Sequence, residues 1–253
     1  MASELNKEFF NQEASSYEDK HQKTLQDIAI KIQSKLDFIG VDWAEDDGDE
    51  DDDDVDDKKA STPARPVRLL DYACGTGSVT TALAQYTTQC VGIDLSENMV
   101  AQYNQRAERQ GLAADEMRAY QGNLCNPDGP SPAAFAGPEF FDFDLAAVCL
   151  GFHHFDDPPL AARRLAERLR PGGVLLIIDF LPHAKMDSAH AASHTVTHHG
   201  FSEEDTRRMF DEAGVGKDFA LDEFSVVFNR RYDAENKLQK MSRHLFIARG
   251  TRA

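Results

Sequence analysis

From residue 67 onward, short apolar segments alternate with segments of helical periodicity, and this alternation restricts the possible folds more than any other feature of the chain. The apolar segments are expected to be buried strands, at 67–73, 89–96, 117–124, 141–152 and 174–180. The expected helices cover 80–86, 96–111, 156–173 and 202–215. Strands that alternate with helices form crossover units. We therefore expect an α/β fold with a mostly parallel sheet and helices on both faces.

The boundaries of several elements carry their own signals. Ser96 and Ser202 are the expected N-caps of two helices. After the last helix, 220–228 and 243–251 are expected to be strands, with a polar loop at 229–242 and no full helix between them. We therefore expect these two strands to pair antiparallel.

Residues 4–40 have helical periodicity. Apolar residues recur there at the spacing of one helix face: Leu25, Ile28, Ala29, Ile32, Leu36 and Ile39. Gly40 follows them as a stop signal. This amphipathic segment must pack against another part of the chain.

Residues 45–57 carry eleven acidic residues and no basic one, so this run accounts for most of the net charge of −17. Like charges repel and apolar residues are nearly absent, which predicts that 44–66 is a disordered linker. Two interpretations stay open: a solvated loop, or a docking surface for a basic protein partner. The acidic balance of the chain disfavours binding to nucleic acid, which requires basic patches.

Composition also bears on the cellular compartment. The four cysteines, Cys74, Cys90, Cys125 and Cys149, form no CxxC pair, and we expect buried free thiols in a reducing compartment. No stretch of 18 uncharged apolar residues is present, and the N-terminus does not resemble a secretory signal. We therefore expect no membrane span and a cytoplasmic location, with a nuclear location open as well.

A glycine turn, DYACGTG at 71–77, lies between the first strand and the first helix after it. Gly75 and Gly77 allow a ligand to approach the backbone closely, and such ligands bind beyond the carboxyl ends of parallel strands. Asp94, seventeen residues after Gly77, ends the next strand, where a carboxylate can accept hydrogen bonds from ribose hydroxyls. A nucleoside-containing ligand is indicated. Thr80 occupies the third glycine position of the dinucleotide fingerprint, which weakens a pyrophosphate interpretation.

Further motifs follow the turn in the order and spacing of a known family: DYACGTG, VGIDLSENMV, QGN, FDLAAVCLGFHHFDDP and RLRPGGVLLIIDF. Over residues 67–180 the chain resembles the class I S-adenosylmethionine-dependent methyltransferases, which have a Rossmann-like sheet. Within them it is similar to the ubiquinone and menaquinone biosynthesis enzymes and to fungal and bacterial small-molecule methyltransferases. The resemblance implies that 67–253 binds S-adenosylmethionine and transfers its methyl group by direct displacement to an oxygen, sulfur, nitrogen or carbon atom of a small-molecule acceptor.

Other functions stay open beside this one. The acidic run would direct a protein methyltransferase, or a regulatory cofactor-binding protein, to a basic partner. A dinucleotide dehydrogenase is disfavoured by Thr80 and by the order of the motifs.

The resemblance implies a role for each residue that matches a family motif at the donor site. Asp71 ends the first strand beside the turn that receives the methionine part of the cofactor, Asp94 binds the ribose hydroxyls, and Tyr17 closes over the cofactor. The other implied cofactor-binding residues are Ala73, Cys74, Gly75 and Gly77 in the turn, Leu95 and Met99 beside the adenine, Asn123 and Leu124 at the adenine edge, and Cys149 and Leu150 behind the methionine and sulfonium.

Two positions depart from the family pattern. Ala73 replaces the usual first glycine of the turn, and Asn123 replaces the usual aspartate after the third strand. Alanine is the smallest replacement for glycine, so we expect binding to persist. The side-chain oxygen of Asn123 is expected to accept a hydrogen bond from the adenine amino group.

The acceptor side is expected in two segments outside the donor motifs. In relatives, an N-terminal segment such as 1–43 folds over both ligands as a helical lid, with ordinary packing on the sheet edge as the alternative. A segment such as 181–201 forms the substrate cap. In this cap, His198 or His199 is a candidate general base for a phenol, thiol or carbon acid, and His153 is a candidate for substrate contact after strand four.

The cap also contains histidines at a regular spacing. His190, His194 and His198 are four residues apart, so they would share one face of a helix. The HxxxH pairs leave a zinc site as an alternative, although we expect no metal. The other interpretation is a polar cap helix whose histidines face solvent.

Overall fold

The computed structural model describes residues 2–44, 65–126, 132–185, 192–232 and 238–253. The acidic run 45–57 and His190 lie outside these ranges, so their predicted roles stay predictions. No helix in the described part of the chain has the length and apolar character of a membrane span.

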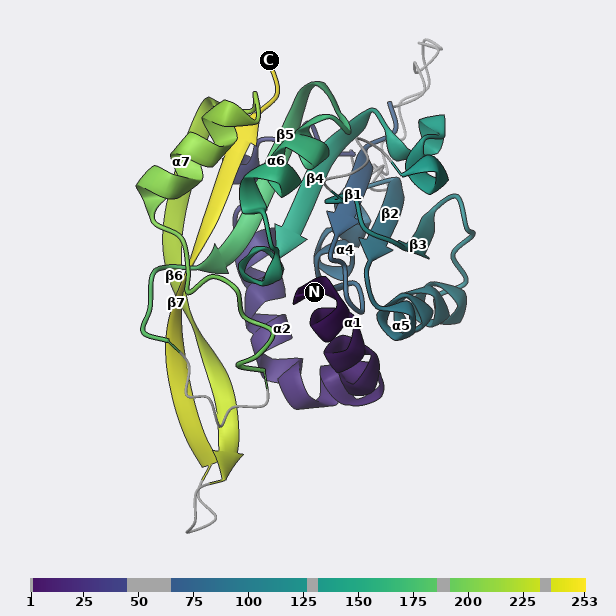
Figure 1. Ribbon diagram of the computed structural model, residues 1–253. Coiled ribbons are helices and arrows are strands. Elements are labelled where there is room, and N and C mark those ends of the chain that lie inside the picture. The colour runs from purple at the N-terminus through teal and green to yellow at the C-terminus, as the bar shows by residue number, and fades with distance from the viewer. Residues whose placement is uncertain (1, 45–64, 127–131, 186–191, 233–237) are drawn as a thin grey trace, which may run out of the picture.

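In the described residues, seven strands form one sheet in the order β3-β2-β1-β4-β5-β7-β6 (Figure 1). The strands are β1 (Arg68–Tyr72), β2 (Gln89–Asp94), β3 (Met117–Gln121), β4 (Phe143–Cys149), β5 (Leu169–Phe180), β6 (Lys217–Tyr232) and β7 (Leu238–Thr251). Strands β1 to β5 pair in parallel, and β7 is antiparallel to both β5 and β6. The predicted mostly parallel sheet with an antiparallel C-terminal strand is confirmed.

Helices cover both faces of this sheet. They are α1 (Ala2–Glu13), α2 (Tyr17–Gln33), α3 (Leu36–Ile39), α4 (Ser78–Leu83), α5 (Glu97–Arg109), α6 (Pro158–Ala166) and α7 (Glu203–Glu212). Short 3₁₀ helices add η1 (Ala14–Ser16), η2 (Ala84–Tyr86), η3 (Ala133–Phe135), η4 (Pro138–Phe140) and η5 (Phe152–His154). Figure 1 shows the arrowheads of the central strands pointing toward α1 and α2, so the carboxyl edge of the sheet lies beside the N-terminal helices.

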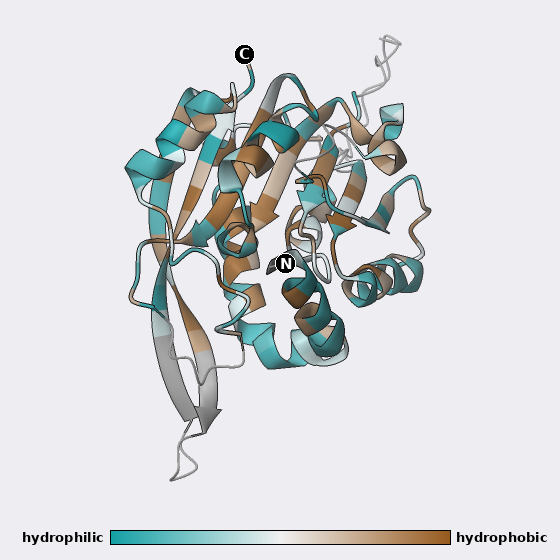
Figure 2. Cartoon of the chain, in the orientation of Figure 1, coloured by the Kyte–Doolittle hydropathy of each residue, from teal (hydrophilic) through white to brown (hydrophobic). Residues whose placement is uncertain are grey.

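Two hydrophobic cores hold the layers together, because successive residues of a strand point to opposite faces. In β4, Leu145 and Ala147 pack with α2, α4 and α5, whereas Ala146 and Val148 pack with α6 and α7. Figure 2 shows hydrophobic residues concentrated in the central strands and hydrophilic residues predominating in α5 and α7. The sheet is therefore buried on both faces, as expected for parallel strands.

Several predicted boundaries differ from the observed ones. The strand predicted at 141–152 ends at Cys149, because Leu150 has a left-handed φ of +54° and η5 follows. The helix predicted at 156–173 ends at Ala166, and its Pro-Gly-Gly end belongs to β5. The polar loop predicted at 229–242 is largely strand, because β6 and β7 pair as one long hairpin that extends past the rest of the sheet (Figure 1).

A buried carboxylate lies at the amino edge of the sheet, opposite the N-terminal helices. Asp144, near the start of β4, is 1% exposed. Its Oδ1 accepts hydrogen bonds from Nη2 of Arg65 and Nε of Arg170, both at 2.5 Å, and its Oδ2 accepts one from the backbone N–H of Arg68 at 2.8 Å. This carboxylate therefore ties three segments of the chain together at the edge remote from the N-terminal helices.

Candidate active site

A large cavity of about 1310 Å³ lies at the carboxyl ends of the central strands. Its walls come from the glycine turn after β1, the ends of β2, β4 and β5, the loop after β3, and the helices α1 and α2. Side chains from β6 and β7, including Phe228 and Arg243, close its far end. Ligands of open α/β sheets bind at this edge, so the cavity is the candidate active site.

The glycine turn forms one wall and has a left-handed backbone at three positions. The φ angles of Ala73, Gly75 and Gly77 are +53°, +52° and +93°. A Cβ atom added at Gly77 would lie 2.8 Å from the ring of Tyr103, whereas one added at Gly75 would meet no atom within 4 Å. Gly77 is thus required for packing behind the wall, and Gly75 leaves open space in front of it. Ala73 keeps the turn conformation despite its Cβ, at a cost of ~1–2 kcal/mol.

Asp71 lies beneath this turn and is fixed by Thr80. Its Oδ2 accepts hydrogen bonds from the backbone N–H of Thr80 at 3.2 Å and from the Thr80 hydroxyl at 2.9 Å. Burial raises the pKa of the Asp71 carboxyl to about 7, and the Thr80 hydrogen bonds oppose this shift. The threonine in the third glycine position therefore anchors the acid that ends β1.

Asp94 connects the end of β2 to the glycine turn. Its Oδ2 accepts a hydrogen bond from the backbone N–H of Gly75 at 2.8 Å, and its Oδ1 accepts one from the backbone N–H of Ser96 at 2.8 Å. Burial raises the pKa of this carboxyl, and these hydrogen bonds oppose the shift. Each carboxylate oxygen can accept a further hydrogen bond, so Asp94 can still receive hydroxyl donors from the cavity.

Asn123 does not have the geometry that the sequence suggested. Its Oδ1 already accepts hydrogen bonds from the hydroxyl of Tyr72 at 3.0 Å and from the backbone N–H of Cys125 at 2.8 Å. An amide oxygen has two lone pairs, so this oxygen is fully used. The predicted acceptance from an adenine amino group is therefore wrong, and the amide nitrogen, a donor, is the group that remains for a ligand.

Most residues expected at the donor site lie in the cavity wall. They are Tyr17, Asp71, Ala73, Cys74, Gly75, Asp94, Leu95, Met99, Asn123, Cys149 and Leu150. Gly77 and Leu124 are not among the described wall residues: Gly77 packs on Tyr103, and Leu124 is 1% exposed in the core. The contact of these two residues with a cofactor is therefore not supported by the geometry.

The N-terminal helices close the cavity from above the glycine turn. In α1, Nδ2 of Asn6 donates to the carbonyl of His154 at 3.0 Å, and the backbone carbonyl of Asn11 accepts from Nδ2 of Asn98 at 3.0 Å. Tyr17 begins α2, and burial raises the pKa of its hydroxyl to about 12. Helices α1 and α2 therefore form a wall of the cavity, and their opening as a lid stays a prediction.

Trp43 differs from the other aromatic residues of the N-terminal segment. Its indole ring lies 6.0 Å from the ring of Tyr86, and its Nε1 donates to the carbonyl of Leu36 at 3.3 Å. Among the described residues it does not line the cavity. Phe9, Phe10 and Tyr17 do line it.

His153 and His154, in η5, also lie in the cavity wall. Nδ1 of His153 lies 2.8 Å from Oδ1 of Asp179, at the end of β5, and Nδ1 of His154 lies 2.8 Å from the carbonyl oxygen of Thr195. Burial lowers the pKa of His154 to about 3. Asp179 lies within the motif RLRPGGVLLIIDF, but this motif does not reveal the pairing with His153, because the two residues are 26 positions apart in the sequence.

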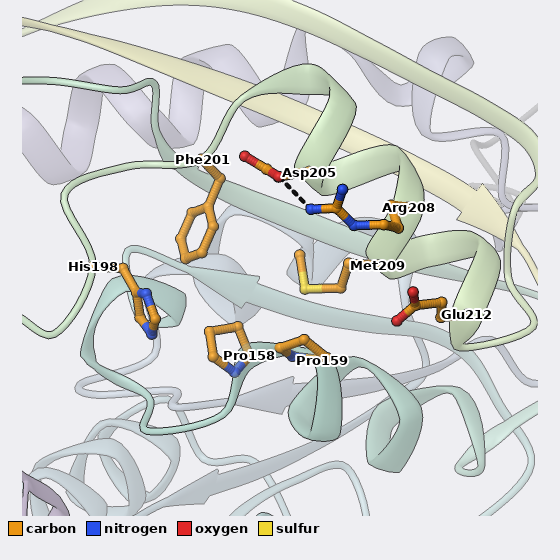
Figure 3. A pocket seen from close by; sticks show the side chains of 8 residues that line it. All are labelled: Pro158, Pro159, His198, Phe201, Asp205, Arg208, Met209 and Glu212. Carbon is orange, nitrogen blue, oxygen red and sulfur yellow. Dashed lines mark hydrogen bonds and ion pairs between the residues drawn. The ribbon is translucent and has the colours of Figure 1, made fainter.

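The two cap histidines that we expected as bases do not line this cavity among the described residues. Nε2 of His198 lies 3.1 Å from the carbonyl oxygen of Phe155, and its ring packs 5.6 Å from that of Phe201. Figure 3 shows His198 beside Phe201 and Pro158, in a separate surface pocket of about 140 Å³ between α6 and α7. The ring of His199 lies 5.9 Å from that of His183. Both expectations of a base in the cap are therefore corrected.

The helical spacing of the cap histidines is not supported either. Residues 192–201 contain turns and irregular backbone and no helix. His194 packs its ring 5.5 Å from Phe9 of α1, away from His198. Within the residues that the structure describes, no three His, Cys, Asp or Glu side chains gather as a metal site would require.

Several wall residues were not recognised from the sequence. At the far end of the cavity they include Leu25, Phe180, Phe228 and Arg243. The rings of Phe180 and Phe228 lie 5.8 Å apart, although 48 positions separate them in the sequence. No local motif could reveal this apolar end, because the tertiary fold assembles it from α2, β5, β6 and β7.

Comparisons with known proteins agree with the geometry of the donor end. The family model described as a methyltransferase domain matches residues 70–175. The chain is 29% identical over 153 residues to an uncharacterized methyltransferase of Schizosaccharomyces pombe, covering 58% of this chain and 52% of the relative. It is 32% identical over 122 residues to the demethylmenaquinone methyltransferase of Thermus thermophilus, covering 47% and 50%. The chain thus spans about half the length of these curated relatives.

Solved structures extend the similarity to the fold. The YcgJ protein of Bacillus subtilis superposes with a TM-score of 0.55 and 18% identity, covering 74% of this chain and 92% of that one. A SAM-dependent methyltransferase of Thermotoga maritima gives a TM-score of 0.60 at 14% identity, covering 97% and 99%. At these identities the likeness shows the shared fold.

Proposed function

We propose that this chain, whose residues 70–175 match the methyltransferase domain family, transfers a methyl group from S-adenosylmethionine to a small-molecule acceptor in the large cavity. The observation that carries the proposal is one continuous cavity, of about 1310 Å³, shared by the glycine turn and an apolar far end. Pockets for a single small molecule measure ~300–1000 Å³. This cavity therefore has room for a donor and an acceptor side by side.

The residues at the donor end fit this cofactor. Asp94 has carboxylate lone pairs to spare for ribose hydroxyls, and Asn123 offers an amide nitrogen as a donor to a purine ring. The open space in front of Gly75 allows close approach to the backbone. When bound, the cofactor supplies a methyl group that its positive sulfur has already activated. The chain must then align the two reactants and keep water out.

Apart from Arg243, the walls named at the far end are aromatic or aliphatic, so they suit a largely apolar acceptor. Phe9, Leu25, Phe180 and Phe228 lie there, next to the two histidines of η5. Helices α1 and α2 cover both ends of the cavity, which supports exclusion of water during transfer. We therefore propose an aromatic or otherwise apolar small molecule as the acceptor.

A transfer assay with methyl-labelled S-adenosylmethionine tests this proposal. The full chain is incubated with phenols, thiols, amines and quinone precursors, and label in the extracted small molecules is counted. We expect label in at least one apolar acceptor. Failure to bind S-adenosylmethionine, or label only in added basic proteins, would overturn the proposed function.

A further inference from the structure

The end of β5 places a fully buried carboxylate directly behind the cavity wall. Asp179 is 0% exposed. Its Oδ1 accepts from the backbone N–H of Phe180 at 2.7 Å, and its Oδ2 accepts from the backbone N–H of His153 at 3.2 Å. Backbone N–H groups can only donate, so they hold the carboxylate in one orientation as an acceptor. The carboxylate is therefore fixed before any ligand binds.

This orientation determines the tautomer of His153. Its Nδ1 lies 2.8 Å from the same Oδ1 of Asp179, so Nδ1 carries the hydrogen and donates it. In the neutral ring, Nε2 then has a free lone pair. Within the described residues, the hydrogen bond of the His153 ring uses Nδ1, which leaves Nε2 for a ligand. A histidine held by a carboxylate at one nitrogen, with the other nitrogen free, is a recurring arrangement in general-base catalysis.

The backbone and neighbouring rings fix the position of His153. Its carbonyl accepts from the backbone N–H groups of Thr197 and His198 at 2.9 and 3.0 Å. Its ring lies 5.0 Å from that of Phe180, edge to face, and 4.0 Å from that of His154. The described end of the cap segment thus braces the histidine that lies in the wall.

His153 lies between the donor end of the cavity, at the glycine turn, and the far end lined by Phe180 and Phe228. Cys149 and Leu150, four and three residues before it, border the donor side at the end of β4. Phe180 and Phe228 border the apolar side. An acceptor in the apolar end would therefore present its reacting atom next to His153.

His154 provides the contrast within the same 3₁₀ helix. Its Nδ1 donates to a backbone carbonyl rather than to a carboxylate, and its own carbonyl holds Asn6 of α1. Burial, followed by the neighbouring charge of His153, lowers its pKa to about 3. A ring that resists protonation this strongly is a poor acceptor of a proton, so His154 is not the candidate base.

We propose that Nε2 of His153, oriented by Asp179, removes the proton from a weakly acidic hydroxyl on an aromatic or apolar acceptor as that oxygen is methylated. This inference rests on the proposed function and names its acceptor class. The acceptor oxygen forms a bond to the methyl carbon, and sulfur keeps the electron pair of the carbon–sulfur bond that breaks. The hydroxyl proton passes to Nε2, and the imidazolium later releases it to water. His153 is the catalytic residue in this step, and Asp179 is a positioning residue.

A general base beside the acceptor indicates that the acceptor carries a proton that must be removed, as a hydroxyl does. The methyl donor is already activated, so an acceptor without a proton, such as a tertiary amine or a thioether, needs no base. A neutral hydroxyl is a weak nucleophile until its proton is removed. The aromatic wall favours a hydroxyl on an aromatic skeleton over one on a polar sugar or an amino acid.

The test uses the full chain with methyl-labelled S-adenosylmethionine and four acceptors: 4-methylphenol, 2-naphthol, 4-nitrophenol and N,N-dimethylaniline. It compares the wild type with His153→Ala, Asp179→Asn and Asp144→Asn. The last variant is the matched control, because Asp144 is equally buried on the neighbouring strand but lies at the opposite edge. Thermal melting identifies any variant that fails to fold, and calorimetry measures binding of S-adenosylmethionine.

We expect His153→Ala to lower kcat on 4-methylphenol by ~10²–10⁴-fold while the Kd for S-adenosylmethionine stays within about twofold. Asp179→Asn should lower kcat in the same direction with a smaller change in KM, because it disturbs the tautomer. At a pH where 4-nitrophenol is already ionised, both losses should shrink. Added imidazole should restore part of the activity of His153→Ala, and Asp144→Asn should retain wild-type kcat wherever it is folded.

The outcomes separate this inference from the proposed function. Absence of S-adenosylmethionine binding would refute the proposed function. If the cofactor binds but only N,N-dimethylaniline, or none of the hydroxyl acceptors, is methylated, the hydroxyl inference alone is refuted. Equal losses on 4-methylphenol and on ionised 4-nitrophenol, with no rescue by imidazole, would reduce His153 and Asp179 to structural residues.

Discussion

Asp144 and Asp179 are buried to almost the same degree on adjacent strands, yet their surroundings differ. Asp144, at the amino edge, is paired with two arginines and a backbone N–H. Asp179, at the carboxyl edge, is paired with backbone N–H groups and one imidazole that faces a cavity. The Asp144 carboxylate is occupied by two guanidinium groups and a backbone N–H, and it connects β4 to the chain before β1 and to β5. The Asp179 carboxylate leaves a reactive nitrogen available, so burial alone does not distinguish a structural acid from a functional one.

The same contrast applies to the two edges as a whole. At the amino edge, Asp144 accepts hydrogen bonds from Arg65, from the backbone of Arg68 and from Arg170, and these bonds join β1, β4 and β5. At the carboxyl edge, Asp94 and Asn123 each keep hydrogen-bonding capacity that a ligand can use. Perturbed and incompletely used polar groups gather at functional sites. Variants at the amino edge should therefore mainly lower the free energy of unfolding, and variants at the carboxyl edge should mainly weaken ligand binding.

The largest expected effect on stability lies at the amino edge. Asp144→Ala leaves Arg170 and Arg65 without their shared partner, and breaking a buried ion pair costs ~3–5 kcal/mol. Arg65 is half exposed, so we expect the lower end of this range. Urea denaturation measures the loss in the free energy of unfolding. A loss below about 1 kcal/mol would remove the structural role assigned to this carboxylate.

A smaller effect is expected at the glycine turn, where two glycines have different neighbours. Gly77→Ala forces a Cβ against the ring of Tyr103 at a left-handed φ, and we expect a loss of ~1–3 kcal/mol in unfolding free energy. Gly75→Ala meets no protein atom, so it should destabilise less and weaken S-adenosylmethionine binding more. Urea denaturation and calorimetry on both variants test the pair. The reverse order would show that Gly75, and not Gly77, is the packing glycine.

The smallest expected effect is the pH dependence contributed by His154. Its pKa in the folded chain is about 3, below the ordinary 6.5, and the nearby titratable groups are His153 and Asp179. The unfolded chain therefore binds a proton that the folded site resists, so stability is full above about pH 6.5 and is lost as pH falls toward 3. His154→Gln should reduce this loss between those pH values. Exposed His244→Gln, the control, should keep the wild-type slope; an unchanged slope in both would contradict the assignment.

The sequence predicted the parts of the molecule that depend on local pattern. The cap at Ser96 is confirmed, because its hydroxyl accepts from the backbone N–H of Met99 at 3.1 Å, and Ser202 caps α7 in the same way. The donor wall follows the ends of successive parallel strands, so Asp71 and Asp94 come together through sheet register alone. Periodicity and end signals were sufficient for these features.

The acceptor side could not be predicted in the same way. His153 and Asp179 meet because β5 lies next to β4, and each lies in a separate motif that does not reveal their pairing. The spacing of His194 and His198 suggested a helix that the described cap does not contain, because its backbone is instead bonded to His153 and to the end of β5. Aromatic side chains from β5 and β6 complete the apolar wall. Tertiary pairing, which no single segment encodes, decides this end of the cavity.

Calorimetric titration of S-adenosylmethionine tests the central claim most directly, on the wild type, Asp94→Ala and Asp205→Ala. Asp205 is an exposed acid on α7 that serves as the control. We expect wild-type and Asp205→Ala chains to bind alike, and Asp94→Ala to bind ~10–150-fold more weakly, because hydrogen bonds to a charged group contribute ~1.5–3 kcal/mol. Equal binding by Asp94→Ala, or binding of NAD in place of S-adenosylmethionine, would contradict the assignment of this cavity to methyl transfer.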